Sequence, residues 1–193
     1  MRKMLLVGLV LTVASVLVVL VSPTLDLELE PVVLLGVSVG AAIALVPDHT
    51  PMGRLAGFLG GFVAAWIGFL LRAAVLPDST GGRAVAVALV VVLVVGLTAA
   101  TLGRAPLWSA LLGAGAFAGA YEFTYSAAPP EFASTSLSSA TALLLTVAVG
   151  FLAASLVAPE GEPALPRRTA WPKRRKYDDA TDRLADLMME DNQ

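Results

Sequence analysis

Six long apolar stretches, separated by short segments with proline, glycine or charged residues, dominate this chain of 193 residues. A bilayer core of about 30 Å requires roughly 20 apolar residues in a helix, and each stretch approaches that length. Only 15% of the residues are charged, whereas an average soluble domain has about 25%. The sequence therefore predicts an all-α, polytopic transmembrane helical bundle with six spans, at about residues 4–21, 31–46, 53–76, 84–102, 106–127 and 137–158.

Three of these stretches allow another interpretation. Residues 4–21 follow Arg2 and Lys3, as in a signal peptide, but the apolar run is long and no small-residue cleavage site follows, so we expect a retained span. The valine-rich run 84–102 is too long for an ordinary buried strand. The span count depends most on the short stretch 31–46 and on the tight turn Gly103–Pro106.

The distribution of basic residues predicts the orientation, because short cytoplasmic loops are enriched in lysine and arginine. With six spans, Arg54, Arg104 and both termini fall on one side, while Arg83 falls on the other. We therefore expect a cell-membrane protein with both termini in the cytoplasm. Three spans in each half would also give the halves opposite orientations, as in the inverted repeats of many transporters. The best residue-level match between the halves, 73–78 beside 154–160, involves only span ends.

Glycines at intervals of four residues mark three of the expected spans, with Gly36 and Gly40 in the second. Small residues allow helix backbones to approach closely in lipid, which predicts helix packing at these positions. The same glycine faces could instead bind a second copy of the chain or line a permeation path. The packing candidates are Gly53, Gly57 and Gly61 in the third span and Gly115 and Gly119 in the fifth.

One charged residue continues each of two glycine stripes, Arg72 in the third span and Glu122 in the fifth. Both should lie near the outer ends of their helices. Because a charge at membrane depth normally faces protein or water, we predict an ion pair between them. The alternative is that each side chain extends separately to the outer interface.

Residues 159–193 have a different composition, which predicts a cytoplasmic tail. Four prolines predict an extended linker, followed by a basic cluster that would contact anionic lipids of the inner leaflet and then a short, acidic amphipathic helix. The helix could dock into a groove on a cytoplasmic protein, fold back on the basic cluster, or stay unfolded. The basic residues are Arg167, Arg168, Lys173, Arg174, Arg175 and Lys176, and the docking residues are Tyr177, Leu184, Leu187 and Met188.

The sequence does not contain an enzyme motif. It has no cysteine, a single histidine (His49), no phosphate-binding loop and no nucleophile elbow. We therefore expect no catalysis, cofactor, metal ion or nucleic acid, and we expect the bilayer and a cytoplasmic protein as partners. The first functional hypothesis is a structural, scaffolding membrane anchor that presents its tail, and the alternative is a small-solute transporter or channel component.

Overall fold

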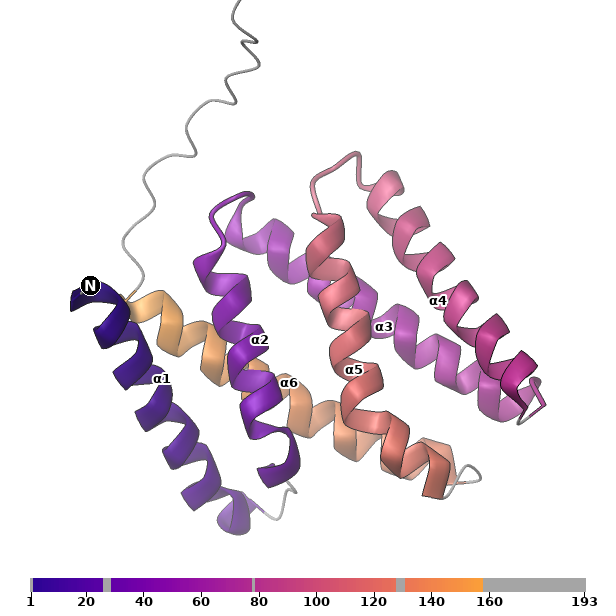
Figure 1. Cartoon of the computed structure of the whole chain (residues 1–193), viewed down its shortest axis with the longest axis horizontal. Coiled ribbons are helices and arrows are strands. Elements are labelled where there is room, and N and C mark those ends of the chain that lie inside the picture. The colour runs from indigo at the N-terminus through magenta and orange to yellow at the C-terminus, as the bar shows by residue number, and fades with distance from the viewer. Residues whose placement is uncertain (1, 26–28, 78, 128–130, 158–193) are drawn as a thin grey trace, which may run out of the picture. The chain divides into compact units, whose positions relative to one another are not determined.

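The computed structural model describes residues 2–25, 29–77, 79–127 and 131–157. All six predicted stretches are helical, and two short 3-10 turns, Ser22–Leu25 and Glu30–Val32, connect the first two helices (Figure 1). The predicted basic cluster and docking helix of the tail lie outside the described residues. The helices are α1 (Arg2–Val21), α2 (Val33–Leu45), α3 (Pro51–Ala74), α4 (Thr80–Ala100), α5 (Leu107–Ala127) and α6 (Phe132–Val157).

Four of the described helices are long and apolar enough to cross a membrane. They correspond to α1, α3, α4 and α6. The helix α2 has 13 residues and is apolar but short. The helix α5 has 21 residues, but three glycines and Glu122 dilute its apolar character. The part of the chain that the structure describes is therefore helical, with four membrane-compatible helices and two further helices packed among them.

Hydroxyl side chains cap the N-terminal ends of α3 and α4. The Thr50 hydroxyl accepts a hydrogen bond from the Gly53 amide at 3.1 Å, and Ser79 accepts one from Gly82 at 3.2 Å. These N-caps satisfy amides that lack helical partners, so α3 and α4 begin a few residues before the predicted spans. The helix α6 begins at Phe132 instead of 137, because the Ser/Thr-rich segment is itself helical.

The turn between α4 and α5 is present where the sequence places it. Leu102 and Gly103 adopt left-handed φ values of 51° and 78°. Glycine reaches this conformation without steric cost. Leu102, whose side chain is exposed, adopts it in spite of the contact between its Cβ atom and the backbone. Two successive left-handed residues reverse the chain within a few positions.

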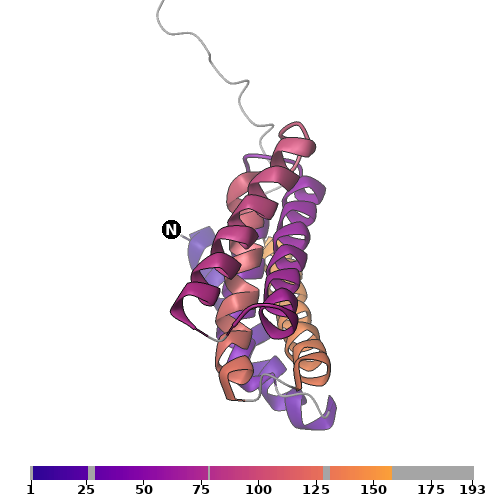
Figure 2. The same cartoon turned by 90° about the vertical axis from the view of Figure 1, so that its right-hand side faces the viewer.

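The packing joins the first and second halves of the chain. The most extensive contacts are those of α2 with α6 and of α3 with α5. In addition, α6 packs on α1, and α3 packs on α4. In Figure 1, α6 runs behind α5 and α2 from the lower right to the left, where it ends beside α1, and α3 runs behind α5 from beside the end of α2 toward the lower right. Figure 2 shows α3, α4 and α5 side by side at the front. The third helix of each half thus covers the first two helices of the other half.

Aromatic rings fill the contact between α3 and α5. The ring centroids of Phe62 and Phe117 are 4.8 Å apart, and those of Phe69 and Tyr121 are 5.4 Å apart, both pairs edge to face. Such pairs add to the energy of burial alone. Phe117 and Tyr121 are completely buried. The core therefore extends along this helix pair toward its charged end.

Candidate functional site

The backbones of α3 and α5 touch where the two helices cross. A Cβ atom added at Gly61 would lie 1.7 Å from the carbonyl oxygen of Ala110. One added at Gly113 would lie 2.0 Å from the carbonyl oxygen of Phe58. Only glycine permits this separation, because the atoms that would clash belong to backbone and cannot rotate away.

The same kind of contact joins α2 and α6. A Cβ atom at Gly40 would lie 2.0 Å from the carbonyl oxygen of Val147. One at Gly150 would lie 2.3 Å from that of Val37. Both crossings therefore place a glycine of each helix against a backbone carbonyl of the other.

The two crossings match residue by residue. Within each pair of equivalent helices, one constant shift in residue number relates all the contacting positions. The helix α2 corresponds to α5, and α3 corresponds to α6. The equivalent residues are Val37 and Ala110, Gly40 and Gly113, Phe58 and Val147, and Gly61 and Gly150.

A hydroxyl faces a glycine at the next position of each crossing, but the two residue types are exchanged. Gly57 of α3 faces Ser109 of α5, whereas the equivalent Thr146 of α6 faces Gly36 of α2. The Ser109 hydroxyl donates to the carbonyl of Arg54, and the Thr146 hydroxyl donates to that of Leu143, which is the equivalent residue. A hydroxyl from either helix thus reaches the same carbonyl.

These contacts define an approximate two-fold relation between the pair α2 and α3 and the pair α5 and α6, and the packing of α1 on α6 corresponds to that of α4 on α3. Equivalent helices run in opposite directions in Figure 1. Three helices thus lie in each half, but the match of 73–78 with 154–160 does not follow the observed correspondence, which pairs Gly61 with Gly150. The span ends resemble each other because both are apolar, whereas the repeat depends on small residues at the crossings.

The predicted packing glycines separate into two groups. In α3, Gly53, Gly57 and Gly61 all lie against the α5 side, Gly53 against the carbonyl of Arg104. In α5, an added Cβ at Gly115 meets nothing within 4 Å, one at Gly119 meets a Leu35 side-chain atom of α2 at 3.9 Å, and the close backbone contact with α3 is made by Gly113. Two residues correspond to about 200° around a helix, so Gly115 faces away from the contact that Gly113 makes.

Arg72 and Glu122 lie together at one end of α3 and α5. The Arg72 Nη1 donates to Glu122 Oε1 at 3.0 Å and to Oε2 at 3.1 Å. The Arg72 guanidinium carbon also lies 4.4 Å from the Tyr125 ring centroid, within the range of a cation–π interaction. The Arg72 side chain is 6% exposed and that of Glu122 is 49% exposed. The carboxylate therefore faces outward, while the arginine is held among aromatic rings.

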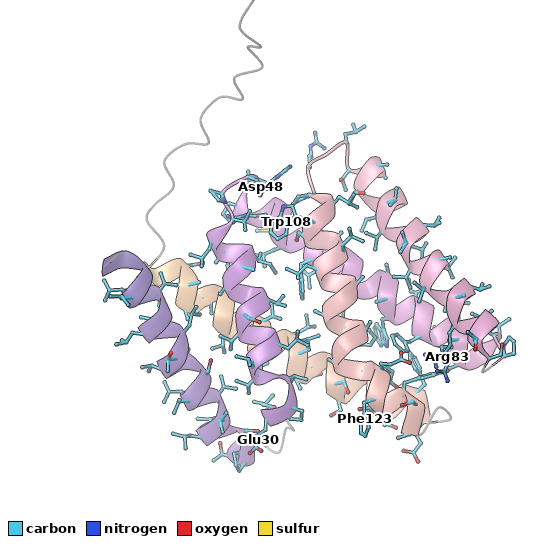
Figure 3. The ribbon with its side chains drawn as sticks, viewed as in Figure 1. Glu30, Asp48, Arg83, Trp108 and Phe123 are labelled. Atoms are coloured by element: carbon cyan, nitrogen blue, oxygen red, sulfur yellow. The ribbon has the colours of Figure 1, made fainter. Side chains whose placement is uncertain are left out.

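Polar contacts at the opposite end connect α2, α3 and α5. Arg54 donates from Nη1 to the carbonyls of Ala44 and Val46. This buried arginine therefore provides hydrogen bonds to carbonyl groups at the C-terminal end of α2 that lack helical partners. Trp108 Nε1 donates to Asp48 Oδ2, and Figure 3 shows these two side chains side by side. Partial burial raises the pKa of the Asp48 carboxyl, but hydrogen bonds with Trp108 and His49 outweigh it and hold the pKa below its ordinary value of 3.8.

The sequence matches no family model, no curated protein and no solved structure. A functional proposal therefore depends on the geometry of the repeat, of its two crossings and of the charged end.

Proposed function

We propose that the chain is a six-span protein of the cell membrane with both termini in the cytoplasm. The helices α2 and α5 pack along α6 and α3, which are themselves long and apolar enough to cross a bilayer. The start of α1 and the end of α6 lie at the same end of the helical body in Figure 1, as six alternating spans require. The basic residues Arg54 and Arg104 fall at that end in the chain order of the helices.

Labelling of single introduced cysteines tests the span number, because the chain has no cysteine of its own. In intact cells, a membrane-impermeant maleimide should label Thr80→Cys and leave Leu102→Cys unlabelled. If α2 and α5 do not cross, the two results are exchanged. Glu131→Cys is labelled in either arrangement and serves as the control, since the chain crosses the membrane an odd number of times before it in both.

For the activity, we propose a small-solute transporter or channel component. The observation that carries this proposal is the repeat of the two glycine crossings in oppositely directed halves. The helix α3 covers helices of the second half, and α6 covers helices of the first. A state in which α3 has moved therefore has a counterpart in which α6 has made the equivalent movement. In a membrane these two states open toward opposite sides, which is the geometric basis of alternating access in inverted-repeat transporters.

Distances between spin labels in proteoliposomes test this activity. One pair, Thr80→Cys with Glu131→Cys, reports on the proposed outer end, and a second pair, Leu45→Cys with Leu102→Cys, reports on the inner end. In each pair we expect one population with a short distance between the labels and one with a long distance. The fraction of molecules with the long distance at the outer end should equal the fraction with the short distance at the inner end. A control pair beside the crossing, Leu59→Cys with Leu111→Cys, should give one population. A single population in all three pairs would contradict transport by alternating access.

A scaffolding anchor remains the second proposal, because the charge pattern of residues 159–193 favours it. The basic cluster of Arg167–Lys176 suits anionic lipid, and the apolar face with Leu184 and Leu187 suits a protein groove. Deletion of residues 160–193 separates the two proposals. A scaffold should lose its cytoplasmic partner on deletion, whereas a transporter should retain both distance populations.

A further inference from the structure

The six helices form two triplets, and each triplet is held together by one of the two glycine crossings. The first triplet is α1, α2 and α6, and the second is α3, α4 and α5. Contacts between the triplets are much less extensive than contacts within them. The two-fold relation of the crossings exchanges one triplet with the other. Because the backbones touch at each crossing, we expect a large movement of the helices to take place between the triplets and not inside them.

The chain passes from one triplet to the other twice, between α2 and α3 and between α5 and α6. The connection of α2 with α3 lies at the proposed inner end. The end of α5 and the start of α6 lie at the opposite end of the helices in Figure 1. Polar side chains bind the triplets to each other at both of these places.

At the inner end, two donors of the second triplet bind the segment where α2 ends. The buried Arg54 of α3 donates to the carbonyls of Ala44 and Val46, to the first at 3.1 Å. Trp108 Nε1 of α5 donates to Asp48 Oδ2 at 2.5 Å, and the two side chains lie side by side in Figure 3. An arginine and a carboxylate take part, and hydrogen bonds of charged groups are stronger than neutral ones. These contacts are the inner closure.

At the outer end, one aromatic residue of the second triplet binds the start of α6. The Tyr121 hydroxyl of α5 lies 2.8 Å from the Thr135 hydroxyl. The Tyr121 ring also meets the Phe132 ring edge to face, with the centroids 5.8 Å apart. These contacts, all between neutral groups, are the outer closure. The ion pair of Arg72 with Glu122 lies at the same end but joins two helices of one triplet.

Between the two closures, the triplets share an apolar core. Ile43 of α2, Phe117 of α5 and Leu143 of α6 are completely buried and belong to one cluster. Apolar contacts have no fixed direction, whereas a hydrogen bond is lost when its geometry changes. The triplets can therefore tilt against each other about this core, and a tilt that opens one end presses the other end together.

We propose that the inner and outer closures are the two gates of alternating access, and that the inner gate is the stronger. The inference rests on the proposed transport activity and names the contacts that control it. Opening toward the cytoplasm breaks the bonds of Arg54 and Trp108, and opening toward the outside breaks the bond of Tyr121. Both closures are formed in the structure, which is the arrangement that the molecule passes through between its two open states. Because the inner closure includes charged groups, the outward-open state should be the more populated one.

The outer and inner spin-label pairs of the transport test also measure this assignment in proteoliposomes. Trp108→Phe removes the indole donor and keeps an aromatic ring, so the ratio of inward-open to outward-open molecules should rise about fivefold. Asp48→Asn, at an exposed position, should change the ratio in the same direction. Tyr121→Phe removes only the hydroxyl and should lower the ratio about threefold.

Glu122→Gln is the matched control, because it weakens a polar contact at the outer end within one triplet. It should leave the ratio unchanged. The label pair at Leu59 and Leu111, within the second triplet, should keep one population in every variant, which shows that this triplet remains folded.

The outcomes separate the gates from the transport proposal. Unchanged ratios, changes of the same sign for Trp108→Phe and Tyr121→Phe, or an excess of inward-open molecules in the unaltered chain would overturn the gates and leave alternating access in place. So would a response to Glu122→Gln as large as that to Tyr121→Phe. A single population at both ends of the unaltered chain would overturn both proposals.

Discussion

The crossing of α3 with α5 and that of α2 with α6 have the same backbone contacts but different side chains around them. In the first, the carbonyl of Arg54 receives its extra hydrogen bond from Ser109 across the helix interface. In the second, the equivalent carbonyl of Leu143 receives one from Thr146 of its own helix. The glycine that makes room is on α3 in one case and on α2 in the other. Close packing therefore constrains the pair of residues, and not the helix that supplies the smaller one.

The two crossings also differ in what lies at their ends. Among the described residues of the two crossings, only the α3 and α5 pair has an ion pair, between Arg72 and Glu122. It lies against aromatic rings, next to an apolar groove between α4 and α5. The shared backbone geometry should therefore govern stability equally in both halves, and the ion pair should add stability in only one of them.

The largest expected effect comes from adding side chains at the crossings. Gly61→Val and Gly150→Val should each destabilise the protein by about 3 kcal/mol or more, because the new Cβ would meet backbone carbonyls that cannot move alone. Thermal unfolding in detergent measures this. Gly96→Ala is the control and should be neutral or slightly stabilising, since the site is open and alanine favours helix. A large effect in only one of the two crossings would break their equivalence.

Removal of the ion pair should have the next largest effect. Arg72→Met leaves the Glu122 carboxylate without its cation, and because that carboxylate is half exposed, we expect a loss of about 1–2 kcal/mol. In the double variant with Glu122→Gln, the loss should be smaller than the sum of the single losses. A double-mutant cycle from unfolding curves measures the coupling. Additive losses would show that the observed pair contributes no coupling energy.

Loss of the crossing hydroxyls should distinguish the two halves. Ser109→Ala removes an interhelical hydrogen bond and should cost about 0.5–1.5 kcal/mol. Thr146→Val keeps the shape of the side chain and removes bonds only within α6, whose carbonyls retain their helical partners, so we expect a smaller loss. The unfolding free energies of the two variants give the comparison. A larger loss for Thr146→Val would contradict the interhelical role of Ser109.

The smallest expected effect concerns Asp48, near the end of α2. Its folded pKa is lower than its ordinary value of 3.8, so its contribution to stability is present above that value and is lost as the pH falls through the folded pKa. Asp48→Asn should remove this acid-dependent part and lower the slope of unfolding temperature between about pH 5 and about pH 2. An unchanged slope would mean that the Trp108 contact does not stabilise the carboxylate.

The packing glycines show where sequence reasoning stopped. The interval of four correctly places Gly57 and Gly61 on one face of α3, but the same rule selects Gly115 and Gly119 in α5, whereas Gly113 makes the contact. Several glycines on one helix define several faces, and periodicity cannot say which face meets a partner. The neighbouring helix decides that, because α3 lies against the face of α5 that carries Gly113 and leaves Gly115 open.

The sequence by itself determined the helical class, the six helices, the turns between them and the charges at the two ends of α3 and α5, because these depend on local composition and spacing. Only the tertiary structure decided that α3 packs on the second half and α6 on the first, and that Gly40 occupies the position equivalent to Gly113. Those features depend on contacts between residues far apart in the chain, in which a glycine without a Cβ atom lies against one backbone carbonyl of another helix. The apolar stretches with which the sequence began are thus sufficient to predict helices in a membrane, and the arrangement of those helices depends on small residues whose partners the sequence does not name.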